Sequence, residues 1–391
     1  MPPVSAPLRL LCVCNYPANT GYAWDFIEGL YAQAARRLAP LGVETFVAYP
    51  RIDAPPRTLD GAPAAPVVLD ATMKTPASVA ATAAFVRERR IDIVYFTDQP
   101  AWSRAYATLR RAGVRRIVVH DHSSGARSTP GGPRRLLKWL LARAPWIVAD
   151  VVIAVSDYVA RRQIESGLMP PGKIVRVWNG LPVPPPRPPG YPLHDALGLD
   201  PARPIVACAC RCAPEKGVST LLRAFDRLLA GRAGAGPAPV LVYMGDGPQF
   251  AEIKALREGL AARDHIVLTG YRTDAGALLT GATICVMPSL WQDALPLAVM
   301  QPMSLGLPVI ASRVGGIPEM IVDGSTGILV PPGDEAALAA AMGTLLDDPA
   351  RAVAFGERAR ERVRDTFDPD VQMDALTALL VDRLAPAGTG A

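Results

Sequence analysis

A chain of 391 residues is long enough for two domains, each with its own hydrophobic core. Hydrophobic residues make up 50% of it and charged residues 20%, which is ordinary for a globular enzyme and excludes an intrinsically disordered chain. The formal net charge of +5, from 41 basic and 36 acidic residues, is mild and gives no reason to expect a nucleic-acid partner.

The sequence contains no apolar stretch as long as a membrane span and no signal-peptide pattern at its N-terminus. We therefore expect a cytoplasmic location. Three of the six cysteines alternate at a spacing of two, whereas metal sites usually place two residues between ligands. We interpret the cysteines as small buried hydrophobic residues and expect no metal site.

The first half of the chain alternates apolar runs with amphipathic segments, which predicts an α/β domain with a parallel sheet. A loop carrying Gly21 separates the first strand from the first helix. Residues 50–76 are rich in Pro and Ala and predict a loop. The expected strands are Leu8–Cys14, Glu44–Ala48, Ile91–Thr97, a strand from Arg116, Val151–Val155 and Ile174–Val177, and the expected helices are Trp24–Leu38, Ala77–Arg90 and Trp102–Arg111.

Two of the four histidines, His120 and His122, lie at the end of the strand that begins at Arg116. Because they are two residues apart in an extended segment, they share one face. We favour a functional role over incidental loop residues. A metal site would need a third ligand, and none is close in the sequence.

The segment Arg134–Leu141 combines three basic residues with apolar ones directly after a proline. It predicts a short helix. We expect it to be half-buried with a solvated basic face. The alternative is peripheral contact with an anionic membrane surface, which would place the protein at the inner face of the membrane.

A proline-dense stretch within residues 182–203 cannot form a helix or a central strand and predicts an extended linker. A second α/β domain follows. Its first strand leads into Arg211, Lys216 and Gly217, and a helix begins at Val218. Two cations at a strand–helix junction suit a diphosphate, because Arg offers two parallel N–H donors and Lys a compact charge.

The stretch from Val286 to Gly333 predicts a strand, loop and helix, followed by another strand, loop and helix. Ligands of parallel α/β sheets bind at the carboxyl ends of the strands, where helix N-termini favour anions. We therefore expect an anionic ligand at Asp293–Leu297 and at Gly315-Gly316. The alternative is that these glycines only form tight turns.

The same stretch resembles the donor-binding motif of the retaining enzymes of glycosyltransferase family 4. That motif contains Pro-Ser, a Glu, seven residues, Glu-Ala-Met, then Gly-x-Pro-Val and Gly-Gly-x-Pro-Glu. The matching residues here are Pro288-Ser289, Asp293, Gln301-Pro302-Met303, Gly306-Leu307-Pro308-Val309 and Gly315-Gly316-Ile317-Pro318-Glu319. Both motif glutamates differ: Asp293 replaces the first and Gln301 the second.

The resemblance implies the GT-B fold, with two doubly wound Rossmann-like domains facing an interdomain cleft. It places an acceptor-side domain in residues 1–181, the linker in 182–203 and a nucleotide-sugar domain in 204–366. Residues 367–391 would form a helix that crosses back to the N-terminal domain.

The resemblance also implies roles for individual residues. His122, with His120 second, would orient donor and acceptor at the reacting centre, and Asp293 would contact the donor sugar. Gln301 would lie on the donor ribose. The remaining implied donor-binding residues are Gly21, Arg211, Lys216, Gly245, Asp246 and Leu297.

The implied function is a retaining, metal-independent hexosyltransferase. It would move a sugar from a nucleotide diphosphate sugar to a saccharide, lipid-linked or small-molecule acceptor, with no cofactor besides this co-substrate. Replacement of both motif glutamates keeps one alternative open, a sugar-nucleotide-binding protein with little transferase activity. A GT-B epimerase or phosphorylase is another.

Overall fold

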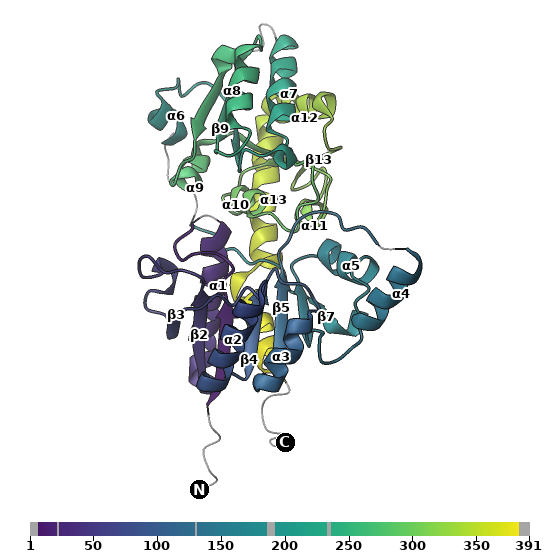
Figure 1. Ribbon diagram of the computed structural model, residues 1–391. Coiled ribbons are helices and arrows are strands. Elements are labelled where there is room, and N and C mark those ends of the chain that lie inside the picture. The colour runs from purple at the N-terminus through teal and green to yellow at the C-terminus, as the bar shows by residue number, and fades with distance from the viewer. Residues whose placement is uncertain (1–6, 22, 130, 186–191, 233–235, 383–391) are drawn as a thin grey trace. The chain divides into compact units, whose positions relative to one another are not determined.

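The computed structural model describes residues 7–382 except 22, 130, 186–191 and 233–235. These residues form two compact units (Figure 1). Within the described residues, the first unit lies in Met1–Ser123, Arg127–Trp178 and Asp370–Ala391, and the second in Ser124–Ala126 and Asn179–Pro369. Each unit is a parallel sheet with helices on it, so the predicted fold class is confirmed.

The first unit contains a seven-stranded sheet in the order β3-β2-β1-β4-β5-β6-β7. The order reverses between β1 and β4, the arrangement of a doubly wound Rossmann-like sheet. Its strands are β1 Leu8–Val13, β2 Val43–Tyr49, β3 Ala64–Val68, β4 Ile93–Thr97, β5 Arg116–Asp121, β6 Val151–Ala154 and β7 Ile174–Arg176. Its helices are α1 Ala23–Leu38, α2 Pro76–Arg89, α3 Arg104–Ala112, α4 Gly132–Leu141, α5 Asp157–Glu165 and α14 Pro369–Val381.

The strands of the first unit are buried on both faces, so alternate residues enter two separate cores. Leu10 and Cys12 of β1 pack with residues of α1 and α14 on one face. Leu11 and Val13 pack with residues of α2 and α3 on the other. The C-terminal helix α14 thus completes the core of the N-terminal sheet through Met373, Leu376 and Leu380.

The second unit contains a six-stranded sheet in the order β10-β9-β8-β11-β12-β13, with the reversal between β8 and β11. Its strands are β8 Ile205–Ala209, β9 Val240–Met244, β10 Ile266–Gly270, β11 Ile284–Met287, β12 Val309–Ser312 and β13 Gly327–Val330. Its helices are α6 Pro192–Leu197, α7 Val218–Ala230, α8 Phe250–Glu258, α9 Ala275–Leu278, α10 Leu297–Ser304, α11 Ile317–Met320, α12 Glu335–Asp347 and α13 Pro349–Thr366. The carboxyl ends of β8 and β11 are neighbours at the switch point.

Three sequence expectations need correction or restriction. The predicted loop 50–76 contains β3, an edge strand that tolerates Pro66 because an edge leaves one row of backbone groups unpaired. Helix α6 lies inside the predicted extended linker 182–203, of which 186–191 fall outside the described residues. Helix α4 forms as predicted but has no buried residue, so the expectation of a half-buried helix was wrong.

Candidate active site

The loop after β8 carries the two predicted diphosphate-binding cations. Arg211 is exposed, and its side chain has no hydrogen bond or ion pair among the residues that the structure describes. Lys216 ends a single helical turn, Pro214–Lys216, and Gly217 follows with φ of +66°. A Cβ on Gly217 would lie 2.1 Å from the carbonyl oxygen of Pro288. Only glycine therefore allows this loop to lie against the loop after β11.

Lys216 and Asp293, which are 77 residues apart, form an ion pair in the second unit. The Lys216 Nζ lies 2.6 Å from Oδ1 of Asp293, and the Ser289 hydroxyl donates a hydrogen bond of 2.6 Å to Oδ2. The Asp293 side chain is only 4% exposed and the Lys216 side chain 20%. The carboxylate is thus held on both oxygens, and part of the Lys216 side chain stays exposed.

The Gly315-Gly316 turn supports the backbone of Asp293. Gly316 N–H donates to the Asp293 carbonyl oxygen over 2.8 Å, and Gly315 N–H donates to the Gln292 side-chain oxygen over 2.6 Å. A Cβ on Gly315 would lie 2.0 Å from the Asp293 carbonyl oxygen, and its φ is +57°. These contacts explain Gly315 by close packing against Asp293 and give Gly316 a backbone hydrogen bond to the same residue.

The N-terminus of α10 follows this loop. Pro296 is the N-cap residue, and no side chain caps the helix. Among the described residues, no acceptor is recorded for the backbone N–H groups of Leu297 and Ala298. Such free N–H groups favour an anion. Gln301 is exposed one turn later, and its Nε2 would lie 2.4 Å from a Cβ on Gly276 of α9, so the two residues are in contact.

Gly245 and Asp246 follow β9. Gly245 is buried, and a Cβ there would lie 1.9 Å from the Cys210 carbonyl oxygen, so this glycine allows the loop to pack on the end of β8. Asp246 is exposed and accepts a hydrogen bond of 2.7 Å from the N–H of Gly247. Its backbone carbonyl accepts one of 2.9 Å from Cys212.

In the first unit, His120 and His122 lie at the carboxyl end of β5 with their ring centroids 4.0 Å apart. This confirms that they share a face. His120 is buried and its Nδ1 hydrogen-bonds the Tyr95 hydroxyl over 2.6 Å. The Nε2 atoms of both histidines are buried and have no partner in the part of the chain that the structure describes. A buried polar atom without a partner needs an explanation, and a ligand is one.

Burial sets the charge state of these histidines. It lowers the pKa of His122 to about 4, although the nearby carboxylate of Asp121 acts in the opposite direction. It lowers the pKa of His120 well below its ordinary value, and the neighbouring His122 adds to this effect. Both rings are therefore neutral near pH 7, and each carries one N–H donor and one acceptor nitrogen.

Asp98 belongs to the same region, and the sequence analysis missed it. It follows β4 with φ of +56°, and its Oδ1 accepts a hydrogen bond of 2.7 Å from the N–H of His122. Burial, with the charge of Asp121 second, raises the pKa of Asp98 to about 7. A strained backbone and a carboxyl group with a raised pKa at a strand end are features of functional sites. The sequence feature that could have indicated Asp98 is its place as a polar residue directly after a buried strand.

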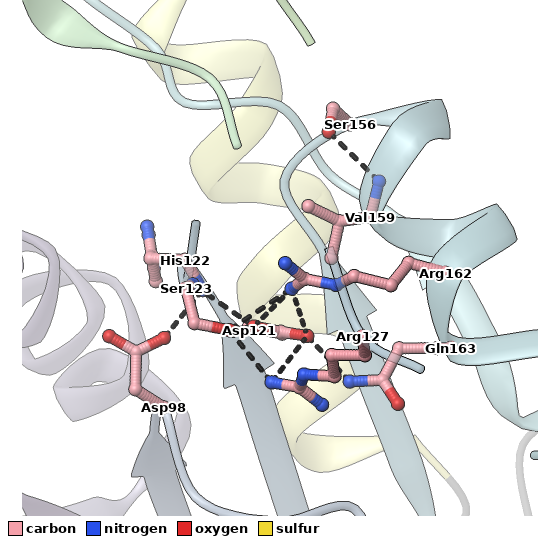
Figure 2. A network of polar contacts seen from close by, with 9 residues as sticks. All are labelled: Asp98, Asp121, His122, Ser123, Arg127, Ser156, Val159, Arg162 and Gln163. Atoms are coloured by element: carbon pink, nitrogen blue, oxygen red, sulfur yellow. Dashed lines mark hydrogen bonds and ion pairs between the residues drawn. The ribbon is translucent and has the colours of Figure 1, made fainter. Parts of the chain in front are cut away.

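A polar network holds Asp121, the last residue of β5 and the neighbour of His122 (Figure 2). Asp121 is bound by the guanidinium of Arg162 at 2.9 Å and by the Gln163 amide at 2.5 Å, both from α5. Although burial alone raises the pKa of Asp121, the ion pair with Arg162 lowers it below its ordinary value. Figure 2 shows the His122 ring on the opposite side of the strand from Arg162, as alternation along a strand requires. Asp121 therefore anchors the strand end that presents His122.

Gly21 lies in the loop between β1 and α1, at the switch point of the first sheet. Its φ is +86°, and a Cβ there would meet no atom within 4 Å. The open space above this backbone is compatible with the predicted close approach of a ligand. In the described part of the chain, no group of three or more His, Cys, Asp or Glu side chains is arranged to hold a metal ion.

Two family models match the chain. "Glycosyl transferases group 1" matches residues 192–362, and "Glycosyltransferase Family 4" matches residues 29–183. A GDP-mannose-dependent alpha-(1-6)-phosphatidylinositol monomannoside mannosyltransferase of Mycolicibacterium smegmatis is 30% identical over 314 residues, which cover 76% of this chain and 78% of the relative.

The chain belongs to glycosyltransferase family 4. The predicted glycosyltransferase function is thereby confirmed over the non-catalytic, epimerase and phosphorylase alternatives. An alpha-maltose-1-phosphate synthase of Mycolicibacterium smegmatis is another relative, 32% identical over 255 residues, which cover 61% of this chain and 64% of that one.

Solved structures of glycosyltransferases share the fold. A glycosyltransferase from Rickettsia africae superposes with a TM-score of 0.80 at 18% identity, covering 98% of this chain and 100% of that one. Anabaena Alr3699/HepE, solved with UDP and glucose, superposes with a TM-score of 0.74 at 18% identity, covering 95% of this chain and 99% of that one. The fold of this glycosyltransferase is thus GT-B.

Proposed function

We propose that this glycosyltransferase transfers a hexosyl group from a nucleotide diphosphate sugar to an acceptor hydroxyl with retention of the anomeric configuration and without a metal ion. The bond between sugar C1 and the diphosphate breaks, a bond between C1 and the acceptor oxygen forms, and the acceptor proton leaves with the diphosphate. The charge that develops on the diphosphate must be stabilised by groups that are already in place.

The observation that carries the proposal is the group of positive charges at the switch point of the second sheet. Arg211 is exposed and unpaired among the described residues, and Lys216 is held by Asp293 with part of its surface open. The free N–H groups at the start of α10 add a partial positive charge. Together these groups are complementary in sign to a diphosphate, which supports the proposal of a reaction without a metal ion.

The identity of the donor and acceptor is a further part of the proposal. Several relatives are named as GDP-mannose-dependent mannosyltransferases that act on phosphatidylinositol monomannosides. GDP-mannose and a glycolipid acceptor are therefore the first pair to test, beside UDP-, ADP- and TDP-sugars. The anomeric configuration of the product, read by NMR, tests retention.

Arg211→Ala is expected to weaken nucleotide binding by about 1.5–3 kcal/mol, because a charge-assisted hydrogen bond to the diphosphate is lost. Isothermal titration with the nucleotide diphosphate that gives the largest thermal shift measures this effect. Since the Arg211 side chain has no partner among the described residues, its truncation is expected to leave the free energy of unfolding unchanged. Arg223→Ala, in the exposed part of α7, is the matched control. Parental affinity in Arg211→Ala would show that the diphosphate binds elsewhere.

Transferase activity is expected to survive EDTA, because Arg211, Lys216 and the start of α10 supply the positive charge that a metal ion would otherwise supply. Initial rates with and without the chelator measure this directly. Loss of activity that Mg²⁺ or Mn²⁺ restores would contradict a metal-independent mechanism.

Gln301 stands where the family motif has a glutamate that would contact the donor ribose. A glutamine has one acceptor oxygen, and charge-assisted hydrogen bonds are about twice as strong as neutral ones. Gln301→Glu is therefore expected to tighten donor binding by about 1 kcal/mol, and Gln301→Ala to weaken it. Gln33→Glu in α1 is the charge-matched control. Equal affinity of the parent and both variants in isothermal titration would show that residue 301 makes no ribose contact.

A further inference from the structure

Helix α4 presents an apolar surface that no other described part of the chain covers. Leu136 is 60% exposed, Trp139 42% and Leu140 53%, and they share one face of the helix because they are spaced i, i+3 and i+4. Leu137 on the same helix is 57% exposed, and Trp146 in the loop that follows is 60% exposed. Leu136, Leu137, Trp139, Leu140 and Trp146 are called the α4 patch below. Exposed apolar patches of this kind mark interaction surfaces.

The opposite face of α4 attaches the helix to the first unit. Leu141 packs on the core formed with α2 and α3. The Lys138 ammonium donates a hydrogen bond of 2.6 Å to the backbone oxygen of Ser166. Arg143 donates to the Leu168 oxygen over 3.1 Å, and its guanidinium lies 4.0 Å from the ring centroid of Trp139. The exposed apolar residues therefore lie on the outer side of an anchored helix. Figure 1 shows α4 at the right-hand edge of its unit.

The segment that carries the α4 patch has charges of one sign only, and the acidic residue of the neighbouring α5 end is Glu165. Residues 126–149 contain no Asp or Glu, and their cations are Arg127, Arg134, Arg135, Lys138 and Arg143. Arg134 and Arg135 are exposed and have no side-chain partner among the described residues. Two copies of this chain that met through the patch would bring like charges together, whereas an anionic surface would attract them.

We propose that the α4 patch docks this glycosyltransferase on an anionic lipid bilayer. Leucine and tryptophan side chains enter the boundary between headgroups and acyl chains, and Arg134 and Arg135 bind lipid phosphates. The helix has 10 residues, about 15 Å at 1.5 Å per residue, so it lies along the surface instead of crossing the hydrocarbon core of about 30 Å. None of the described helices is long and apolar enough to span a membrane.

The test is flotation of the full chain with vesicles, without any sugar substrate, so its result does not depend on the proposed donor chemistry. We expect binding to equimolar phosphatidylcholine and phosphatidylglycerol and little binding to phosphatidylcholine alone. Arg134→Gln/Arg135→Gln is expected to weaken partitioning by about tenfold or more, since each cation near an anionic surface contributes about fivefold. Salt at about 1 M, where the Debye length is about 3 Å, should weaken the binding of the parent protein to the anionic vesicles to a similar extent.

The apolar contribution is tested separately. Leu136→Ser/Trp139→Ser/Leu140→Ser is expected to abolish binding at any salt concentration. The contact of the Arg143 guanidinium with the Trp139 ring is lost, so circular dichroism and thermal unfolding verify that the variant is folded at the assay temperature. Leu41→Ser, at a residue 68% exposed outside α4, and Lys74→Gln/Arg87→Gln are the apolar and charge controls. Parental flotation of the triple variant, or equal binding to both vesicle types, overturns the proposal. A dimer in analytical ultracentrifugation that the triple variant converts to a monomer, with no flotation of the parent, assigns the patch to self-association instead.

Discussion

Lys216→Ala is expected to lower kcat/KM by about 10²–10³ and, unlike Arg211→Ala, also to destabilise the fold. The proposed catalytic effect arises because a preorganised positive charge beside the leaving diphosphate is lost, and removal of one such group typically costs this much in rate. The stability effect arises because the Asp293 carboxylate, 4% exposed, loses its cation. Breaking a buried pair from one side costs about 3–5 kcal/mol, although the partial exposure of Lys216 reduces this value.

A double-mutant cycle separates the two effects. Asp293→Asn and Lys216→Ala/Asp293→Asn are measured for unfolding in denaturant and for steady-state rates. If Lys216 acts on the donor, the double variant is more stable than Lys216→Ala, but its transfer rate stays as low as that of Lys216→Ala. Arg313→Ala breaks the exposed Arg313–Asp323 pair, 51% and 43% exposed, and should change stability by about 0–1 kcal/mol with no effect on rate. A double variant that recovers both quantities would make Lys216 a purely structural residue.

The Lys216–Asp293 pair illustrates what the sequence could and could not predict. The strand and helix pattern predicts both sheets, and a Gly after a cation at a strand end predicts a phosphate loop. Nothing in the residues indicates that Lys216 meets Asp293, because that contact depends on β8 and β11 being neighbours in the strand order. The resemblance assigned one residue to the diphosphate and the other to the sugar. The structure adds that each fixes the other.

The features that the sequence did not predict correctly, strand β3, the exposure of helix α4 and the role of Asp98, have a common physical origin. The edge strand β3 was missed because its proline-containing sequence has the composition of a loop, and only pairing with β2 reveals it. Helix α4 was expected to be half-buried, since apolar residues usually are, whereas Leu136 and Leu140 are exposed. Asp98 was missed because its role depends on its contact with the His122 backbone, 24 residues away. In each case the deciding contact is tertiary.

His122→Ala is expected to lower kcat by about 10²–10³ while changing donor affinity little, because the resemblance places its role at the reacting centre and a single oriented hydrogen-bonding group there contributes about this much. Its buried Nε2 has no partner in the described residues, so the variant breaks no side-chain hydrogen bond there. It does remove the ring that packs against His120, so some loss of stability is expected, and rates are compared below the unfolding transition of the variant. His120→Ala is the matched comparison. It leaves the Tyr95 hydroxyl unpaired, which costs about 1–3 kcal/mol of stability.

The pH dependence distinguishes a neutral His122 from a charged one. Its pKa of about 4 means that the ring is neutral throughout pH 6–8 and gains a proton only as the pH falls towards 4. The ratio of parental to His122→Ala rates is therefore expected to shrink below pH 5, where protonation removes the acceptor nitrogen. Between pH 6 and 8 the ring itself does not titrate, but Asp98, which accepts the hydrogen bond of the His122 N–H and has a pKa of about 7, does. The ratio is therefore measured in the Asp98→Asn background, where it is expected to stay constant from pH 6 to 8. A ratio that still changes there with a midpoint near 6.5, the ordinary value for histidine, would show that the imidazolium form takes part. Equal rates for the parent and His122→Ala at every pH would remove this strand end from the mechanism.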